Sequence, residues 1–295
     1  MHKVLFVATS DIHIRVFHIP YLKWLKETGC EVHLAVEKRS GQEVPYVDRM
    51  FHLPFPRTLF SFANFTTLRH LGEIIRDNDY DLVHCHTPVP SMLARIAARR
   101  SRKKGTRVLY TAHGFHFFKG GPLKNWLVYF PAEYLMSAFT DGIVTINRED
   151  YDISRRRMLA GNAFRIKGIG VDPQKFRPLD ENGRDRAREA LGYDRGSFIL
   201  LYVAEFIYRK NHRFIIEALP ELVRRIPTLK VLFAGTGVRL EDTIAEAKRL
   251  KVDGYVDFLG FRDDVPTLAA IADVGISSSR QEGLGLGLAE EMLCG

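Results

Sequence analysis

The stretch Gln281-Glu282-Gly283-Leu284-Gly285-Leu286-Gly287-Leu288-Ala289-Glu290-Glu291-Met292 lies near the end of the 295-residue sequence and is its most informative part. Three glycines lead from a predicted loop into a helix that begins near Leu286, and two carboxylates, Glu282 and Glu290, flank them. Glycines at such a junction let backbone N–H groups and a helix N-terminus approach an anionic group closely. A carboxylate further along the helix can accept hydrogen bonds from sugar or ribose hydroxyls. A solvated acidic helix start is the alternative interpretation.

Outward from this stretch, short apolar runs alternate with longer amphipathic stretches along the whole chain. Runs rich in Val, Ile and Leu are typical of buried parallel strands, which helices then connect. In the first half we predict strands at Val4–Ala8, Glu31–Val36, Leu82–His84, Arg107–Thr111 and Gly142–Ile146, and helices at Val16–Thr28, Leu68–Asn78, Ser91–Arg102 and Lys124–Ala138. In the second half we predict strands at Phe198–Val203, Lys230–Phe233, Val256–Leu259 and Val274–Ile276, and helices at His212–Arg225, Arg239–Lys251 and Val265–Ile271.

These patterns predict an α/β protein made of two Rossmann-like, parallel-sheet domains. A turn-rich connector near Ile166–Pro178 divides them, so we predict domains at residues 1–178 and 179–295. A doubly wound second domain would need a further strand and helix to close its sheet, and we expect that this domain is incomplete.

Composition narrows the class of protein without deciding the function. The net charge of +8 favours anionic partners, which include nucleic acid, anionic lipid and anionic small molecules. Cys30, Cys85 and Cys294 lie far apart, which indicates neither a disulfide framework nor a zinc site and favours a reducing cytoplasm. The first apolar run is too short for a signal-peptide core, and no run of about 18 apolar residues predicts a membrane span.

The Gln281–Met292 stretch resembles the E-x7-E signature of family-four retaining glycosyltransferases, which usually reads E-G-F-G-L-P-x-x-E-A-M-A-C-G. Gly287 stands where Pro is usual, and Glu291 stands where Ala is usual. The resemblance implies the GT-B architecture, in which two Rossmann-like domains face each other across a cleft. It also implies that Glu282 is a catalytic residue, which positions the donor sugar, and that Glu290 holds the ribose of the nucleotide.

Upstream segments resemble other donor-site motifs of the same family. The stretch Val203-Ala204-Glu205-Phe206-Ile207-Tyr208-Arg209-Lys210-Asn211 is similar to V-G-R-L-x-x-x-K-N, whose Arg and Lys neutralise the donor diphosphate. Lys210 matches, whereas Glu205 stands where Arg is usual, so we expect Arg209 or another cation to supply the missing charge. The remaining residues implied to bind the donor are Gly235, Gly237, Phe261, Gly283, Leu284, Gly285 and Leu286.

The first half should supply the acceptor side. His113 and His116 follow a predicted strand at the edge where open α/β sheets bind ligands, and His113 matches the catalytic histidine that the family places there. We assign His13 and Arg15, in the first loop, to the acceptor side as well. His84 and His86 are interpreted as structural or cleft-lining residues, on the expectation that they face opposite sides of the sheet and because no third metal ligand is evident.

A basic cluster and several aromatic residues suggest contact with an anionic membrane. The cluster is Arg95, Arg99, Arg100, Arg102, Lys103 and Lys104, and the aromatics are Phe115, Phe117, Phe118, Trp126, Tyr129 and Phe130. A solvated helix end is the alternative. The resemblance to exopolysaccharide and capsule enzymes implies a lipid-linked or saccharide acceptor and a protein at the inner face of the cell membrane.

We therefore expect a retaining glycosyltransferase that uses a nucleotide-sugar, with UDP-sugars favoured, and that needs neither a metal nor a cofactor. Cationic side chains and a helix N-terminus would offset the charge of the leaving diphosphate. A UDP-sugar 2-epimerase of the same fold is one alternative, and a non-catalytic binding partner is another. No recognition-helix, zinc or RNA-binding signature supports a nucleic-acid partner.

Overall fold

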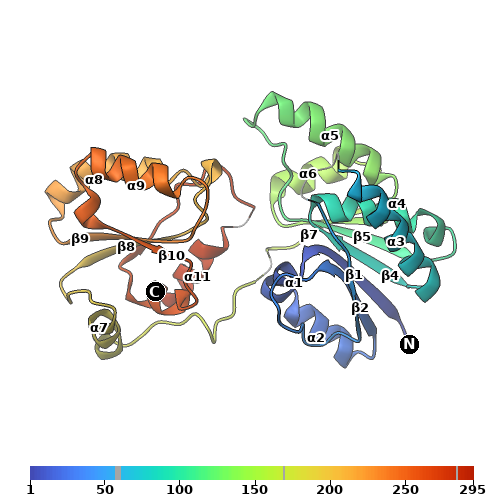
Figure 1. Cartoon of the computed structure of the whole chain (residues 1–295), viewed down its shortest axis with the longest axis horizontal. Coiled ribbons are helices and arrows are strands. Elements are labelled where there is room, and N and C mark those ends of the chain that lie inside the picture. The colour runs from blue at the N-terminus through green and yellow to red at the C-terminus, as the bar shows by residue number, and fades with distance from the viewer. Residues whose placement is uncertain (57–60, 169, 284) are drawn as a thin grey trace. The chain divides into compact units, whose positions relative to one another are not determined.

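A computed structural model describes residues 1–56, 61–168, 170–283 and 285–295. The chain divides into two compact units, Met1–Ile169 and Gly170–Gly295, here called the N-terminal and C-terminal units (Figure 1). The division falls within the turn-rich connector predicted from the sequence, between residues 169 and 170 rather than at the predicted boundary between 178 and 179. Each unit has its own sheet and its own core.

The N-terminal unit is built on a parallel sheet whose described strands have the order β3-β2-β1-β4-β5-β6-β7. The strands are β1 (Lys3–Ser10), β2 (Glu31–Glu37), β3 (Arg49–His52), β4 (Leu82–His86), β5 (Arg107–Ala112), β6 (Gly142–Thr145) and β7 (Asn162–Arg165). The helices are α1 (Asp11–Phe17), α2 (Ile19–Glu27), α3 (Ala63–Asn78), α4 (Pro88–Arg102), α5 (Leu123–Ser137) and α6 (Arg148–Arg157).

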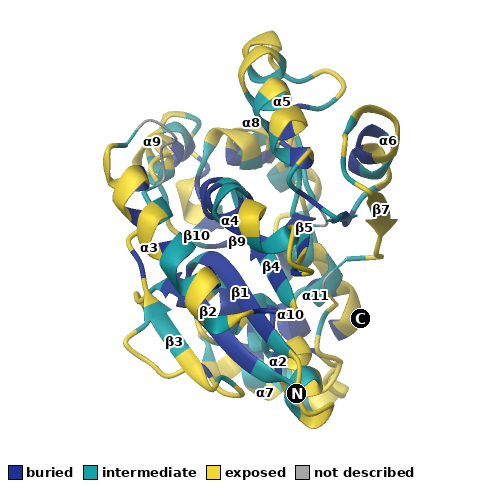
Figure 2. Cartoon of the chain, turned by 90° about the vertical axis from the view of Figure 1, so that its right-hand side faces the viewer, coloured by how far each residue is buried: buried dark blue, intermediate teal, exposed yellow. Residues whose placement is uncertain are grey.

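Alternating residues of the central strand β1 fill two separate cores. Leu5 and Val7 pack with α3 and α4, whereas Val4, Phe6 and Ala8 pack on the other face with residues of α1 and α2. Figure 2 shows β1 and β4 buried. This two-sided burial explains the continuous apolar run that predicted the strand.

The C-terminal unit has a smaller parallel sheet, with the described strands in the order β10-β9-β8-β11. The strands are β8 (Phe198–Val203), β9 (Leu229–Ala234), β10 (Val256–Gly260) and β11 (Val274–Gly275). The α-helices are α7 (Glu181–Ala190), α8 (His212–Arg225), α9 (Leu240–Arg249), α10 (Val265–Ile271) and α11 (Leu286–Cys294), and short 3-10 turns lie at Tyr208–Lys210 and Asp253–Tyr255.

Several elements differ from the sequence prediction. The single helix predicted at Val16–Thr28 is two helices, because His18 ends α1 and Pro20 lies in the first turn of α2. Strands β3 and β7 were not predicted, and neither were α6 and α7. The strand predicted to end at His84 continues to His86, which places both histidines on β4.

Each sheet has a point where the strand order reverses direction. In the N-terminal unit this switch point lies between β1 and β4, and in the C-terminal unit it lies between β8 and β11. Loops at the carboxyl ends of strands beside a switch point form the usual ligand site of open α/β sheets. The residues predicted to carry chemistry follow β1 and β5 in the N-terminal unit and β8, β9, β10 and β11 in the C-terminal unit.

Candidate active site

Three charged side chains predicted to bind the donor lie together in the C-terminal unit. Lys210 Nζ donates a hydrogen bond to Glu282 Oε1 at 2.5 Å, and Arg209 Nη1 lies 3.4 Å from Glu282 Oε2. Burial favours the neutral acid, but hydrogen bonds from Lys210 and Ser279 and the charges of Lys210 and Arg209 outweigh it. These groups hold the pKa of the Glu282 carboxyl below its usual value. The site therefore holds an ionised carboxylate between two cations.

Hydrogen bonds hold the loop after β8 against the loop after β11. The hydroxyl of Tyr202, on β8, donates to the Lys210 carbonyl at 2.8 Å and contacts Ser279 Oγ at 2.9 Å. Ser278 Oγ also donates to the Lys210 carbonyl, at 3.1 Å. The backbone N–H of Arg280 donates to the Arg209 carbonyl at 2.8 Å. Residues far apart in the sequence thus position the Lys210 backbone at the switch point.

The two glycines that follow β9 are required by close backbone contacts. A Cβ placed on Gly235 would lie 2.0 Å from the Ala204 carbonyl oxygen, and one on Gly237 would lie 2.6 Å from the Phe206 carbonyl oxygen. Gly235 N–H also donates to the Gly260 carbonyl at 2.7 Å, so the ends of β9 and β10 meet there. Phe261, the next residue, is 77% exposed.

The start of α11 completes this region. Gly285 is the N-cap residue with a φ of 70°, a left-handed conformation that glycine adopts without strain, and Leu286 begins the helix. Gly287 faces the end of β8, since a Cβ there would lie 3.1 Å from the Val203 carbonyl oxygen. Burial raises the pKa of the Glu290 carboxyl, while the charge of Lys175 opposes this shift. Gly283 precedes the cap, and Leu284, predicted to bind the donor, lies outside the described residues.

Glu205, which replaces the usual arginine, is exposed, and no ion pair of its carboxylate occurs among the described residues. Arg209, the cation expected to supply the missing charge, contacts the Glu282 carboxylate. The sequence prediction overlooked Arg280, whose guanidinium stacks on Tyr208 at 4.8 Å and donates to Asn211 Oδ1 at 3.2 Å. Its place in the same loop as Glu282 could have drawn attention to it.

In the N-terminal unit, His113 belongs to a cluster of histidines at the carboxyl ends of β1, β4 and β5. His113 Nε2 lies 3.4 Å from His86 Nδ1, and His13 Nε2 lies 3.3 Å from His18 Nε2. The sequence interpretation of His84 and His86 is wrong on one point. Residues two apart on a strand face the same side, and these two rings lie 4.2 Å apart. The imidazoles of His13, His18 and His113 also lie close to His86, which the sequence did not reveal.

The histidines of this cluster are neutral at pH 7. Burial lowers the pKa of His13 to about 3 and that of His113 to about 4, and the neighbouring imidazole of His113 adds to the shift of His13. Burial also lowers the pKa of His18 and of His86, with neighbouring imidazoles adding to the effect. Their ring nitrogens are thus available as hydrogen-bond acceptors or ligands.

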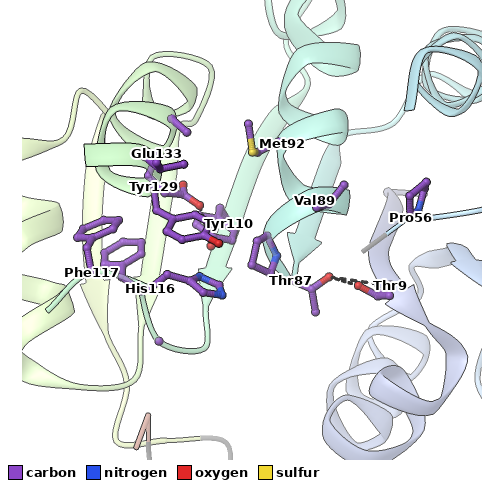
Figure 3. A pocket seen from close by; sticks show the side chains of 15 residues that line it. Thr9, Pro56, Thr87, Val89, Met92, Tyr110, His116, Phe117, Tyr129 and Glu133 are labelled. Carbon is purple, nitrogen blue, oxygen red and sulfur yellow. Dashed lines mark hydrogen bonds between the residues drawn. The ribbon is translucent and has the colours of Figure 1, made fainter. Parts of the chain in front are cut away.

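A pocket of about 450 Å³ opens beside this cluster within the N-terminal unit (Figure 3). His116 and Tyr129 stack at 4.7 Å on one side of it, and the hydroxyls of Thr9 and Thr87 lie 2.9 Å apart on the other. Thr87 has a φ of 63°, a strained conformation for a β-branched residue. Strain of this kind is concentrated at functional sites. His116, predicted to lie on the acceptor side, lines this pocket, whereas Arg15 bonds to the Glu43 carbonyl.

Part of the surface predicted to meet a membrane is buried instead. Arg95 is completely buried, donates to Glu133 Oε2 at 2.9 Å and stacks over Tyr110. Phe115 and Phe117 belong to the core. The helix α5 presents other apolar residues, because Leu123, Leu127, Val128 and Leu135 are exposed. None of the described helices is long and apolar enough to span a bilayer.

Comparison with known proteins identifies the class that this fold and site define. Residues 3–147 match the family described as "Glycosyl transferase 4-like", and residues 183–295 match "Glycosyl transferases group 1". The protein is a glycosyltransferase of the GT-B fold that acts on nucleotide-sugars. The chain belongs to glycosyltransferase family four, as the resemblance implied.

Similar proteins include the putative glycosyltransferase EpsD of Bacillus subtilis, which is 45% identical over 98% of this chain and 76% of its own length. The UDP-Gal:α-D-GlcNAc-diphosphoundecaprenol α-1,3-galactosyltransferase of Escherichia coli is 28% identical over 88% of this chain and 68% of its own length. Anabaena HepE, solved with UDP and glucose, has a TM-score of 0.75 at 18% identity over 100% of this chain and 79% of its own. These matches do not favour the epimerase alternative.

Proposed function

We propose that the protein transfers a sugar from a UDP-sugar to a lipid-linked or saccharide acceptor, with retention of anomeric configuration, in cell-surface polysaccharide synthesis. The names of two relatives support this proposal. One is a putative glycosyltransferase, EpsD, and the other takes galactose from UDP-galactose to a diphosphoundecaprenol-linked sugar. The structural likeness to HepE adds only the fold.

The contact between Lys210 and Glu282 is the observation that carries the proposal. The two cations Lys210 and Arg209 lie at the switch point of the C-terminal sheet, beside the start of α11. Cations together with backbone N–H groups at a helix N-terminus attract a diphosphate. Gly235 and Gly237 let the turn after β9 pack directly on the backbone after β8, which holds the carboxyl ends of these two strands together.

The charge on Glu282 favours a positioning role for this residue. Its two oxygens contact Lys210 and Arg209, which makes the carboxylate a poor nucleophile. In the proposed reaction the acceptor oxygen bonds to the anomeric carbon on the face from which the diphosphate leaves. The acceptor proton passes to the leaving phosphate oxygen, and Lys210 and Arg209 offset the negative charge that develops there. Glu282 then holds a sugar hydroxyl, and Glu290 holds the ribose.

The acceptor side rests on the pocket of the N-terminal unit. The pocket combines apolar walls with the Thr9 and Thr87 hydroxyls, a lining that suits a saccharide attached to an apolar carrier. His113, a neutral imidazole at the end of β5, would hydrogen-bond the transferred sugar. We propose that the exposed apolar residues of α5 hold the protein at the inner face of the membrane.

The test is a transfer assay with UDP-, GDP- and ADP-sugars and a lipid-linked acceptor, in which NMR reports the anomeric configuration of the product. We expect transfer from a UDP-sugar with retention. Lys210→Gln and Glu282→Gln should each lower kcat/KM by roughly 10²- to 10³-fold, since each removes a charge that acts in the transition state.

Lys230→Gln is the matched control. Lys230 lies at the start of β9, so it is at the amino ends of the strands, opposite to the carboxyl ends that carry the site, and it bonds to the Gly254 carbonyl. It should leave kcat/KM within about twofold, as surface changes away from a site usually do. Inversion of configuration, preference for GDP- or ADP-sugars, or equal losses in the Lys210 and Lys230 variants would overturn the proposal.

A further inference from the structure

Four histidines from separate segments of the N-terminal unit bring their ring nitrogens to one point. They are His13 on α1, His18 just after it, His86 at the end of β4 and His113 after β5. One nitrogen from each ring lies within 4.8 Å of the corresponding nitrogen of every other. His18 and His86 are buried, whereas His13 and His113 are partly open to solvent. An ion could therefore enter from the side of His13 and His113.

The distances between these nitrogens match those around a tetrahedral metal ion. A zinc ion binds imidazole nitrogen at roughly 2.0–2.1 Å, which places neighbouring ligand nitrogens of a tetrahedron about 3.3–3.4 Å apart. The His13–His18 and His86–His113 separations are 3.3 and 3.4 Å. The two separations involve different histidines, so they correspond to two opposite edges of one tetrahedron. We propose that the four imidazoles bind one divalent transition-metal ion of the zinc class.

The hydrogen bonding of His86 is weak at both ring nitrogens. This residue is 1% exposed, and its Nε2 has no hydrogen-bond partner in the described part of the chain. Its other nitrogen meets only the ring of His113, at a distance longer than the roughly 2.7–3.2 Å of a good hydrogen bond. Buried polar groups are normally satisfied, and Nδ1, the nitrogen that gives the 3.4 Å separation, has only this long contact, so it is the His86 atom that an ion would satisfy.

The chemistry of the ligands selects the ion. All four are imidazoles, and neutral imidazole suits zinc, nickel, copper and cobalt, whereas magnesium, calcium and manganese prefer oxygen ligands. His84, the fifth histidine in the region, is excluded because its Nε2 contacts Thr111 Oγ1 at 2.8 Å. It belongs to the surroundings of the site.

One consequence rests on the proposed function, in which His113 contacts the transferred sugar. A nitrogen that holds a metal ion cannot also hydrogen-bond a hydroxyl, so a bound ion should inhibit transfer and chelation should restore it. Metal binding is measured without donor or acceptor. The site and the reaction can therefore fail independently.

The experiment titrates the protein, made without a histidine tag, with Co²⁺ and then with Zn²⁺ as competitor. We expect one Co²⁺ per chain, with the intense visible absorption of tetrahedral coordination, which Zn²⁺ abolishes. His18→Gln and His86→Gln should each weaken binding by about 100-fold or more, because a tetrahedral site loses one of four ligands.

His33→Gln is the matched control, since His33 is a buried histidine of the same sheet that bonds to Tyr80 and Glu31. It should bind Co²⁺ as the wild type does. Circular dichroism identifies a variant that fails to fold. If the His18 or the His86 variant does not fold, the other one tests the site. Absence of stoichiometric binding by the wild type, or equal weakening in the His18 and His33 variants, would overturn the proposal.

Discussion

Glu291 is a buried carboxyl group at the position where the E-x7-E family signature has alanine. Its Oε2 has no hydrogen-bond partner among the described residues, and burial, with the neighbouring Glu290, raises its pKa to about 8. The side chain packs against β11, where a Cβ on Gly275 would lie 2.1 Å from Oε2. Glycine at 275 thus makes room for the larger residue at 291. At neutral pH the carboxyl group carries its proton.

This protonation makes the stability of the protein dependent on pH. The pKa of Glu291 is about 8 in the folded state and about 4.5 when unfolded, so its contribution is complete below pH 4.5 and is lost as the pH rises through 8. The loss is on the order of a few kcal/mol. Glu291→Gln should remove it, so the Tm of the variant should exceed that of the wild type increasingly from pH 5 to pH 9. The exposed Glu221→Gln serves as control, and parallel Tm curves for Glu291→Gln and the wild type would contradict this interpretation.

At the scale of elements, the turn after β9 decides how closely β8, β9 and β10 approach at their carboxyl ends, where the donor site is proposed. Gly235 has a φ of 154°, and a Cβ there would lie 2.0 Å from the Ala204 carbonyl oxygen. The neighbouring atom is backbone, so it cannot move without moving the loop after β8. The same close approach holds the carboxyl ends of β8 and β9 together, which links the stability of this unit to its proposed site.

Gly235→Ala should therefore lower the free energy of unfolding by about 3 kcal/mol or more, through steric clash and an unfavourable φ. Gly254→Ala is the matched control, because a Cβ there meets no described atom within 4 Å and its φ is ordinary. Its effect should stay within about 0.5 kcal/mol. Urea unfolding of both variants measures the difference, and equal midpoints would show that the loop relaxes without cost.

For the whole molecule, the net charge of +8 and the exposed apolar residues of α5 both bear on membrane binding. Leu123, Leu127 and Leu135 recur at intervals of four or eight residues, so they lie along one side of the helix. An apolar helix face on a basic protein is attracted to a surface of anionic lipid. This combination supports the proposed location at the inner face of the membrane.

We expect the protein to sediment with vesicles that contain phosphatidylglycerol, more weakly with pure phosphatidylcholine, and less at high salt. Leu127→Gln with Leu135→Gln should weaken binding by roughly tenfold or more, given the apolar area that they would bury in lipid. Leu159→Gln is the control, because Leu159 is an exposed leucine outside α5. Unchanged binding of the double variant would exclude α5 as the contact.

The sequence identified elements that have a strong apolar pattern and missed those without one. Strands β3 and β7 have no fully buried residue, and they form the two edges of the N-terminal sheet. Helices α6 and α7 are dominated by charged residues, although Asn147 and Asp180 cap their first turns and could have revealed them. Edge strands and polar helices bury too little apolar surface to leave a periodic signal.

The sequence by itself determined the alternation of strands and helices and the family, and it named Glu282 and Lys210 as donor-site candidates. These features depend on local periodicity and on short motifs, which the chain carries in consecutive residues. Only the tertiary structure decided that Arg95 is buried against Glu133 and that four histidines meet at the ends of β1, β4 and β5. Such contacts depend on strand order, because parallel strands adjacent in the sheet bring together residues that are distant in the sequence.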